Sequence, residues 1–267
     1  MKLNNYSSFL LGYFVLMVIF WAGIQLTKPT NLPINLTYSF ALPNMAFLGG
    51  VFGIIISRQW GMFKSAVGKG VFFLSAGLIS WGGVGGYLWS YYNFVLHQNI
   101  PYPSLSDGGF IAAVVLWAIG IFFLSKATGV QYGLKKKMGR LYLVVFPIVT
   151  LALSYYLLVT VARAGSITSG GGLFKVFFDF AYPIGDVVII TIALLVYSLS
   201  FKYLGGRFKF PVIIILLGFV AMFFGDFSFS YTTTINTYFN GSYPDLLFTV
   251  AMFLMSFGIV SFYTEKT

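Results

Sequence analysis

Long apolar stretches separated by short polar connections dominate the sequence. Eight of these stretches are long enough, at about 20 residues each, to cross a bilayer as a helix. They lie at approximately 8–26, 38–57, 71–96, 105–125, 141–161, 174–200, 209–228 and 243–263. The first stretch is too long for the apolar region of a signal peptide, and no small-x-small cleavage site follows it. The pattern therefore predicts an all-α, polytopic membrane bundle of eight helices that forms one domain, residues 1–267.

The composition supports a membrane protein and excludes several functions. Hydrophobic residues make up 58% of the chain and charged residues only 8%, against roughly 25% charged in soluble domains. The net charge of +10 would indicate a nucleic-acid partner in a soluble protein. Here the few charges lie between apolar stretches, so we expect the lipid bilayer as the partner and no nucleic acid. Because the chain has no cysteine, disulfides, thiol nucleophiles and Cys-ligated metals are excluded.

The positive charges alternate along the connections. Eleven Lys and Arg residues lie in the connections after the second, fourth and sixth stretches, whereas the others hold only Lys28, Arg163 and Lys175. This alternation predicts that both termini are cytoplasmic in the cell membrane. The run 135–137 is three lysines, Lys135, Lys136 and Lys137. It is a topology signal, or a contact with anionic inner-leaflet lipids.

Two sets of similar residues suggest an internal duplication. The sequence F-A-L-P at 40–43 recurs as F-A-Y-P at 180–183. Three further residues recur at nearly the same displacement: Asp107, Phe110 and Gly120 match Asp245, Phe248 and Gly258. We interpret the chain as two four-helix repeats in the same orientation, residues 1–134 and 135–267, related by a pseudo-twofold axis along the membrane normal. The alternative is chance similarity between apolar segments.

The acidic residues gather toward the predicted outer side. Apart from Glu265, they are the aspartates Asp107, Asp179, Asp186, Asp226 and Asp245. At a rise of about 1.5 Å per residue, Asp186 lies about 24 Å from Lys202 and Asp226 about 26 Å from Lys209. Both are therefore a few ångströms inside the outer face, where a carboxylate facing lipid is costly. They either face the interior of the bundle or, as Pro183 suggests for Asp186, begin a helix and meet its dipole.

The aspartates and nearby aromatic residues predict an outward-facing, acidic and aromatic pocket. Asp186 and Asp226 would form its floor, and Asp107 and Asp245 would lie at its mouth. The aromatic candidates for its wall are Tyr182, Tyr231 and Trp89, with Trp81, Tyr91, Tyr92 and Tyr238. Such a pocket suits a cation, an organic amine or a proton. His97 either titrates near the mouth or is an ordinary interfacial residue.

The sequence lacks the residues that several known cofactors and reactions require. No lysine lies within the last helix to bind retinal, and no G-x-x-x-x-G-K-[ST] loop is present. A single histidine cannot supply a multi-histidine metal site. The sequence therefore identifies no cofactor and no catalytic residue.

Three motifs resemble a bacterial membrane module. They are P-Y-P-S-L-S-D at 101–107, A-Y-P-I-G-D at 181–186, and Gly225-Asp226 followed by Tyr238, Gly241-Ser242 and Asp245. Over about residues 100–262, the chain resembles the multi-span N-terminal module of bacterial diguanylate cyclase and phosphodiesterase signalling proteins. The resemblance implies a sensory or ligand-binding module. No effector domain follows the last stretch, so signalling would require a cytoplasmic or membrane protein partner.

The sequence leaves three functions open. The first is a sensory or small-ligand-binding module, and the second is a secondary transporter of a cation or protonated amine. The third is an intramembrane aspartate-dependent lipid hydrolase. It rests on a weaker similarity to eight-span lysoplasmalogenase-type hydrolases, whose helical Gly-Asp is present here but whose helical histidine has no counterpart. An enzymatic role is therefore the least favoured.

Overall fold

The chain forms a bundle of eight long apolar helices, as the sequence predicts. The structure is a computed structural model that describes residues 4–27, 33–98, 100–168, 172–200 and 206–264. Within these ranges it contains eight helices long and apolar enough to cross a membrane, and no strand. The protein is therefore a multi-pass helical membrane protein. Lys28, Lys202 and Glu265, which entered the sequence predictions, lie outside the described residues.

Most of the eight spans are single helices. These are α1 (Asn5–Thr27), α2 (Pro33–Gln59), α5 (Leu105–Ala127), α8 (Leu173–Ser200), α9 (Gly206–Thr234) and α10 (Tyr243–Val260). The third span combines α3 (Ala66–Ile79), the π-helical η2 (Ser80–Gly86), α4 (Tyr87–Ser90) and the π-helical η3 (Tyr91–Val95). The fifth span combines α7 (Lys137–Ser154) with the π-helical η4 (Tyr155–Val161). Two short helices, η1 (Met62–Lys64) and α6 (Val130–Leu134), lie in connections.

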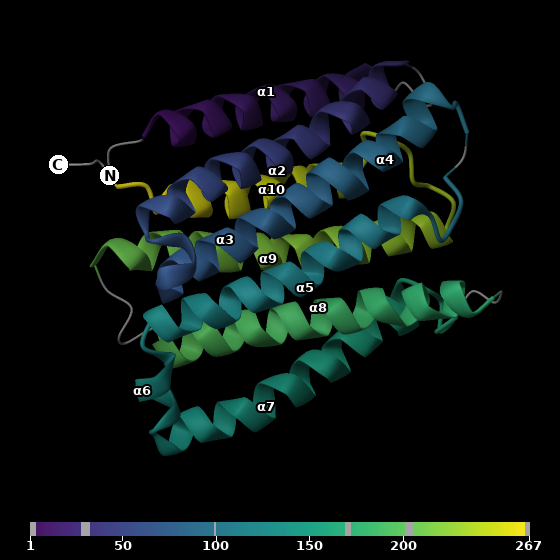
Figure 1. The fold of residues 1–267 in the computed structure, drawn as a ribbon. Helices are drawn as coiled ribbons and strands as arrows, with labels where there is room; N and C mark the ends of the chain where they lie inside the picture. The colour runs from purple at the N-terminus through teal and green to yellow at the C-terminus, as the bar shows by residue number, and fades with distance from the viewer. Residues whose placement is uncertain (1–3, 28–32, 99, 169–171, 201–205, 265–267) are drawn as a thin grey trace.

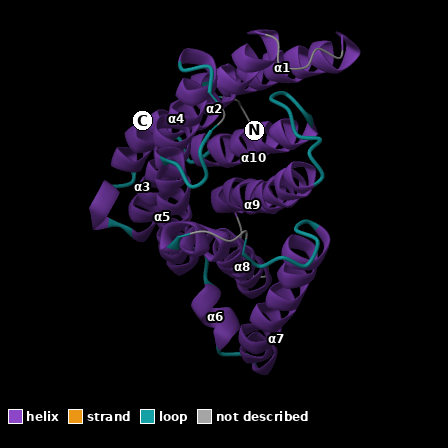
Figure 2. Cartoon of the chain, turned by 90° about the vertical axis from the view of Figure 1, so that its right-hand side faces the viewer, coloured by secondary structure: helices purple, strands orange, loops and turns teal. Residues whose placement is uncertain are grey.

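The spans lie side by side along one axis, with α1 at one edge of the bundle and α7 at the opposite edge (Figure 1, Figure 2). We call the end with the connections 96–104, 162–172 and 235–242 the distal end. The other end, with the connections 60–65 and 128–136, is the proximal end. The lysine run 135–137 lies at the proximal end, whereas Arg163 lies at the distal end. The opposite ends of the bundle therefore differ in charge in the way the sequence predicts.

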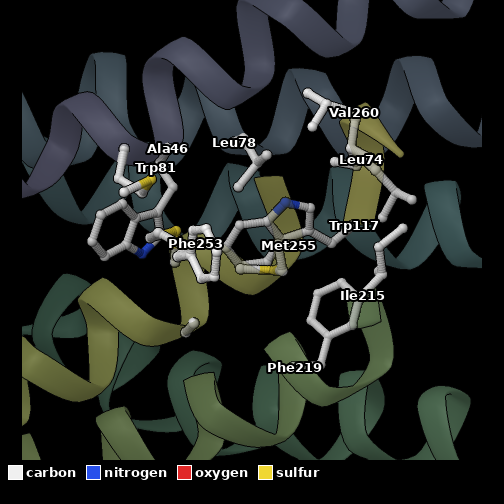
Figure 3. Packing of buried hydrophobic residues seen from close by; sticks show 14 of the residues in the cluster. Ala46, Leu74, Leu78, Trp81, Trp117, Ile215, Phe219, Phe253, Met255 and Val260 are labelled. Carbon is white, nitrogen blue, oxygen red and sulfur yellow. The ribbon is translucent and has the colours of Figure 1, made fainter. Parts of the chain in front are cut away.

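Small residues bring α2 close to its neighbours. Gly49 lies against Ser256 of α10, and a methyl group there would overlap with that side chain. Gly50 and Gly53 lie against Ser75 of α3. In a bilayer, helices associate through such close contacts because lipid is as apolar as the side chains. Deeper in the bundle, Trp117 of α5 packs edge-on to Phe219 of α9, with ring centroids 5.7 Å apart (Figure 3).

The contacts between the third and fourth spans recur between the seventh and eighth. The recurring pairs are Gly85–Phe110 and Gly225–Phe248, and Leu74–Gly120 and Ile215–Gly258. The interval from Leu74 to Gly85 is one residue longer than the interval from Ile215 to Gly225. The π-helical segment Ser80–Gly86 lies in the longer interval, and a π-bulge is the form in which a helix accommodates one additional residue. In addition, α5 packs against α8, and α10 packs against α2.

Candidate functional site

A cavity of about 650 Å³ lies in the distal half of the bundle. Its wall comes from α2, the third span, α5, α8, α9 and α10, together with the connections at the distal end. Aromatic side chains form much of the wall, among them Trp81, Trp89, Tyr182 and Phe229. Ligand pockets for small molecules have volumes of about 300–1,000 Å³, so the cavity can hold a small organic ligand.

Asp186 of α8 and Asp226 of α9 meet in the wall of this cavity. Their carboxyl groups lie within hydrogen-bonding reach of each other. An ionised carboxyl can only accept hydrogen bonds, so a hydrogen bond between them requires a proton on one of the two groups. A glycine precedes each aspartate and brings its helix close to a neighbouring helix. Gly185 packs against Val114 of α5, and Gly225 packs against the Phe248 ring of α10.

A second, smaller cavity of about 20 Å³ adjoins the same two aspartates. Its remaining wall is apolar and includes Trp117, Phe219 and Met222. A cavity of this size has room for one water molecule. The Asp186–Asp226 pair therefore separates the large distal cavity from a small one enclosed by α5, α8 and α9.

Asp107 and Asp245 also line the large cavity, but their carboxylate oxygens accept hydrogen bonds that cap two helices. Asp107 Oδ2 accepts hydrogen bonds from the Ser104 backbone N–H at 2.6 Å and the Ser104 hydroxyl at 2.9 Å, and Oδ1 accepts one from the Tyr182 hydroxyl at 2.5 Å. Asp245 accepts from the Gly241 N–H at 2.6 Å and from the Tyr238 hydroxyl at 3.1 Å. Carboxylates at the start of a helix are stabilised in this way. Both residues thus lie in the first turn of a helix and cap its N-terminus.

The phenol groups at the distal end are held neutral. Burial raises the pKa of Tyr238 well above its usual range, and the neighbouring Asp245 carboxyl raises this pKa further. Burial likewise raises the pKa of Tyr102, whose hydroxyl donates to Asp179 Oδ1 at 2.9 Å. Neutral phenols are hydrogen-bond donors, so these tyrosines hold the carboxylates of Asp179 and Asp245.

Arg163, which follows η4, contacts a backbone carbonyl of α8 that Pro183 leaves without its helical hydrogen bond. Pro183 has no backbone N–H, so it leaves the Asp179 carbonyl, four residues earlier in α8, without its helical donor. Arg163 Nη1 donates to this carbonyl at 2.9 Å, and Nε lies 3.4 Å from the Ser230 hydroxyl of α9. Arg163 and Asp186 line the same cavity.

The predicted site residues fall into two groups. Six of the seven ligand-binding candidates line the cavity: Asp107, Asp186, Asp226, Asp245, Tyr182 and Trp89. Tyr231 is not among the lining residues; its side chain is 37% exposed and its ring lies beside Phe227. The physical reason is helical geometry, since a position five residues beyond Asp226 is rotated by about 140°.

Other wall predictions divide in the same way. Trp81 and Tyr238 line the cavity, whereas Tyr91 and Tyr92 do not, and neither does His97, which is exposed. Tyr102, Arg163 and Ser230 also line the cavity, although they were not among the predicted wall residues. The signal for Arg163 was present, because it is one of the few cations on the predicted outer side.

In the first half of the chain, small residues occupy the positions that correspond to the acid pair, and the helices are in direct contact there. In the register that aligns residues 40–43 with 180–183, Asp186 and Asp226 correspond to Ala46 and Gly86. There α2 packs directly on the third span, and a methyl group at Gly86 would lie 2.6 Å from the Pro43 side chain. The two carboxyls thus lie at a junction that small residues close in the other half.

Comparison with known proteins adds no family. No family model, curated protein or solved structure matches the chain.

Proposed function

We propose that this membrane protein is a sensory or small-ligand-binding module whose distal cavity binds a small organic cation. The observation that supports it is the adjacent pair of carboxyl groups, Asp186 and Asp226, in the wall of a cavity of about 650 Å³. Ionisable groups inside the membrane are costly and mark binding sites or ion pathways. An ammonium group placed against the pair would compensate that cost.

The surroundings of the pair favour an organic cation over a metal ion. Aromatic faces attract ammonium groups, and Tyr182, Trp89 and Phe229 lie in the same wall. Within the described residues, no group of three or more acidic, histidine or cysteine side chains is placed to hold a metal. The cavity is also far larger than a single ion needs.

The predicted topology places this cavity on the outer face of the cell membrane, with the cation-rich proximal end in the cytoplasm. The resemblance to the membrane modules of bacterial diguanylate cyclase and phosphodiesterase proteins supports a sensory role. The proximal end would then contact a protein partner or, through the lysine run 135–137, anionic lipids.

A second candidate is a carrier that exchanges a proton for a cation. The small cavity on the other side of the Asp186–Asp226 pair favours it, because a carrier must expose its site alternately to both sides. We also propose the four-plus-four duplication, which the recurring contacts of the third–fourth and seventh–eighth spans support. Many transporters consist of such repeats.

The test is a ligand screen on purified protein. We expect primary and quaternary ammonium compounds to raise the unfolding temperature, and their uncharged hydroxyl analogues to leave it unchanged. The stabilisation should disappear in Asp186→Asn and Asp226→Asn and persist in Tyr231→Phe, whose side chain lies outside the cavity wall. Stabilisation by neutral analogues alone would contradict the proposal.

The same preparation separates the alternatives. In proteoliposomes, uptake of a stabilising amine that depends on Asp186 would assign the carrier. Turnover of a lipid that is lost in Asp226→Asn would instead assign the hydrolase, since two carboxyls that share a proton can activate a water.

A further inference from the structure

The cavity presents a positive group as well as the acid pair. Arg163 lies in its wall at the distal end, together with Lys175. Arg163 contacts the Asp179 carbonyl and lies near the Ser230 hydroxyl, both of which are neutral groups. Its Nη2 makes no hydrogen bond to any residue that the structure describes. A guanidinium offers five N–H donors in a planar fork that fits a carboxylate, so Arg163 retains donors for a ligand.

No carboxylate in the described part of the chain forms an ion pair with Arg163. Arg163 and Asp186 line the same cavity, and no hydrogen bond joins them within the described residues. Arg163 is partly buried, and buried charges are usually paired with an opposite charge. The structure thus holds an arginine that is anchored through its Nη1 and Nε atoms and whose Nη2 donors are not used by the described residues.

In the first half of the chain, the carbonyl that corresponds to that of Asp179 accepts a hydrogen bond without an arginine. Pro43 leaves the Ser39 carbonyl without its helical donor, just as Pro183 does for Asp179. The Ser90 hydroxyl donates directly to the Ser39 carbonyl at 3.1 Å. In the register that aligns Pro43 with Pro183, Ser90 corresponds to Ser230. A serine alone therefore satisfies the equivalent carbonyl, whereas in the second half Arg163 lies between the two groups.

We propose that the cavity binds a zwitterionic amine, with its ammonium group on the Asp186–Asp226 pair and its carboxylate on Arg163. This inference rests on the proposed function, because it assumes that the acid pair binds an ammonium group. It adds the anionic group of the ligand and the residue that selects it. Arg163 is then a specificity-determining residue, and Lys175 adds positive charge at the mouth.

The test compares three probes with one side chain: L-phenylalanine, L-phenylalaninamide and phenethylamine. Below the α-amino pKa of roughly 7.7–8.0, for example at about pH 6, all three carry an ammonium group, and only the first carries a carboxylate. For the wild-type protein we expect L-phenylalanine to bind at least about tenfold more tightly than the other two, as a charge-assisted hydrogen-bond pair implies. The same series on leucine separates the contribution of the aromatic ring.

Substitution of the arginine decides the inference. In Arg163→Gln the preference for L-phenylalanine over L-phenylalaninamide should fall to about one, and in Arg163→Lys it should be partly retained. The ratio is measured within each variant, so a general loss of stability does not imitate the effect. The unfolding temperature of the ligand-free variant gives a separate check of folding.

Three outcomes would overturn the inference. If Arg163→Gln leaves the ratio unchanged and tightens all three probes, Arg163 is only an internal counter-ion of the acid pair. If the wild type binds the amine and the amide but not the amino acid, the ligand is a simple cation, and the proposed function stands without this inference. If no probe and no other ammonium compound binds, the proposed function fails as well.

Discussion

The Tyr182 hydroxyl donates a hydrogen bond of 2.5 Å to Asp107 Oδ1, and this bond joins α8 to the first turn of α5. Tyr182 lies one residue before Pro183 and four before Asp186. The bond therefore ties the part of α8 that holds the acid pair to a capped helix end. Asp107 therefore has a structural role, although its predicted position at the mouth of the pocket suggested a contact with a ligand.

Replacing Tyr182 with phenylalanine should remove this link and keep the ring in the wall. We expect the free energy of unfolding to fall by about 1 kcal/mol, which is the size of interhelical hydrogen bonds in membrane proteins. Reversible unfolding in mixed micelles measures it. Tyr231→Phe is the matched control, because its ring lies outside the cavity wall, and it should have no effect. Equal values for the two variants would contradict the role of the Tyr182–Asp107 bond.

The chain has no cysteine, so single introduced thiols can report its orientation. Ser166 is an exposed residue at the distal end in the mouth of the cavity, and Lys135 is exposed at the proximal end. We expect an impermeant thiol reagent to label Ser166→Cys in intact cells. It should label Lys135→Cys only after the membrane is permeabilised. The reverse pattern would place the cavity on the cytoplasmic side.

Alkaline pH should weaken the distal end through Tyr238. Its phenol pKa is raised by burial, so the folded state holds the proton more tightly than the unfolded state. The stability from this group is complete below about pH 10, the ordinary pKa of tyrosine, and is lost as the pH rises toward the folded value. The difference between the unfolding temperatures at pH 8 and above pH 10 should therefore be smaller for Tyr238→Phe than for the wild type. Tyr91→Phe, at an exposed position, should behave like the wild type.

The eight spans followed from the sequence because membrane thickness fixes the length of an apolar helix. The depth of each aspartate also followed, since helical rise converts a residue count into a height. By this count Asp186 and Asp226 lie at similar heights, and in the structure both line the same cavity. Rotation about the helix axis was not available from counting alone. For this reason Tyr231 was a candidate although it lies outside the wall.

The partners of the polar groups depended on contacts between helices. The Ser104–Asp107 cap follows a local pattern, S-x-x-D, that resembles a capping box. The link from Pro183 through the Asp179 carbonyl to Arg163 joins residues of two spans and has no local signature. The sequence indicated that Arg163 lies on the side of the aspartates, but only the structure, in which η4 packs beside α9 and Arg163 reaches α8, shows which group it contacts.

The central claim is that Asp186 and Asp226 together bind an organic cation. Calorimetric titration of the purified protein with phenethylamine, in two buffers that differ in ionisation enthalpy, tests it most directly. We predict that the wild type releases the shared proton as the amine binds, up to one proton per amine, because an ammonium group favours the ionised form of both carboxyls. Asp226→Asn should bind at least about tenfold more weakly and release no proton. Unchanged affinity in Asp226→Asn would contradict the claim.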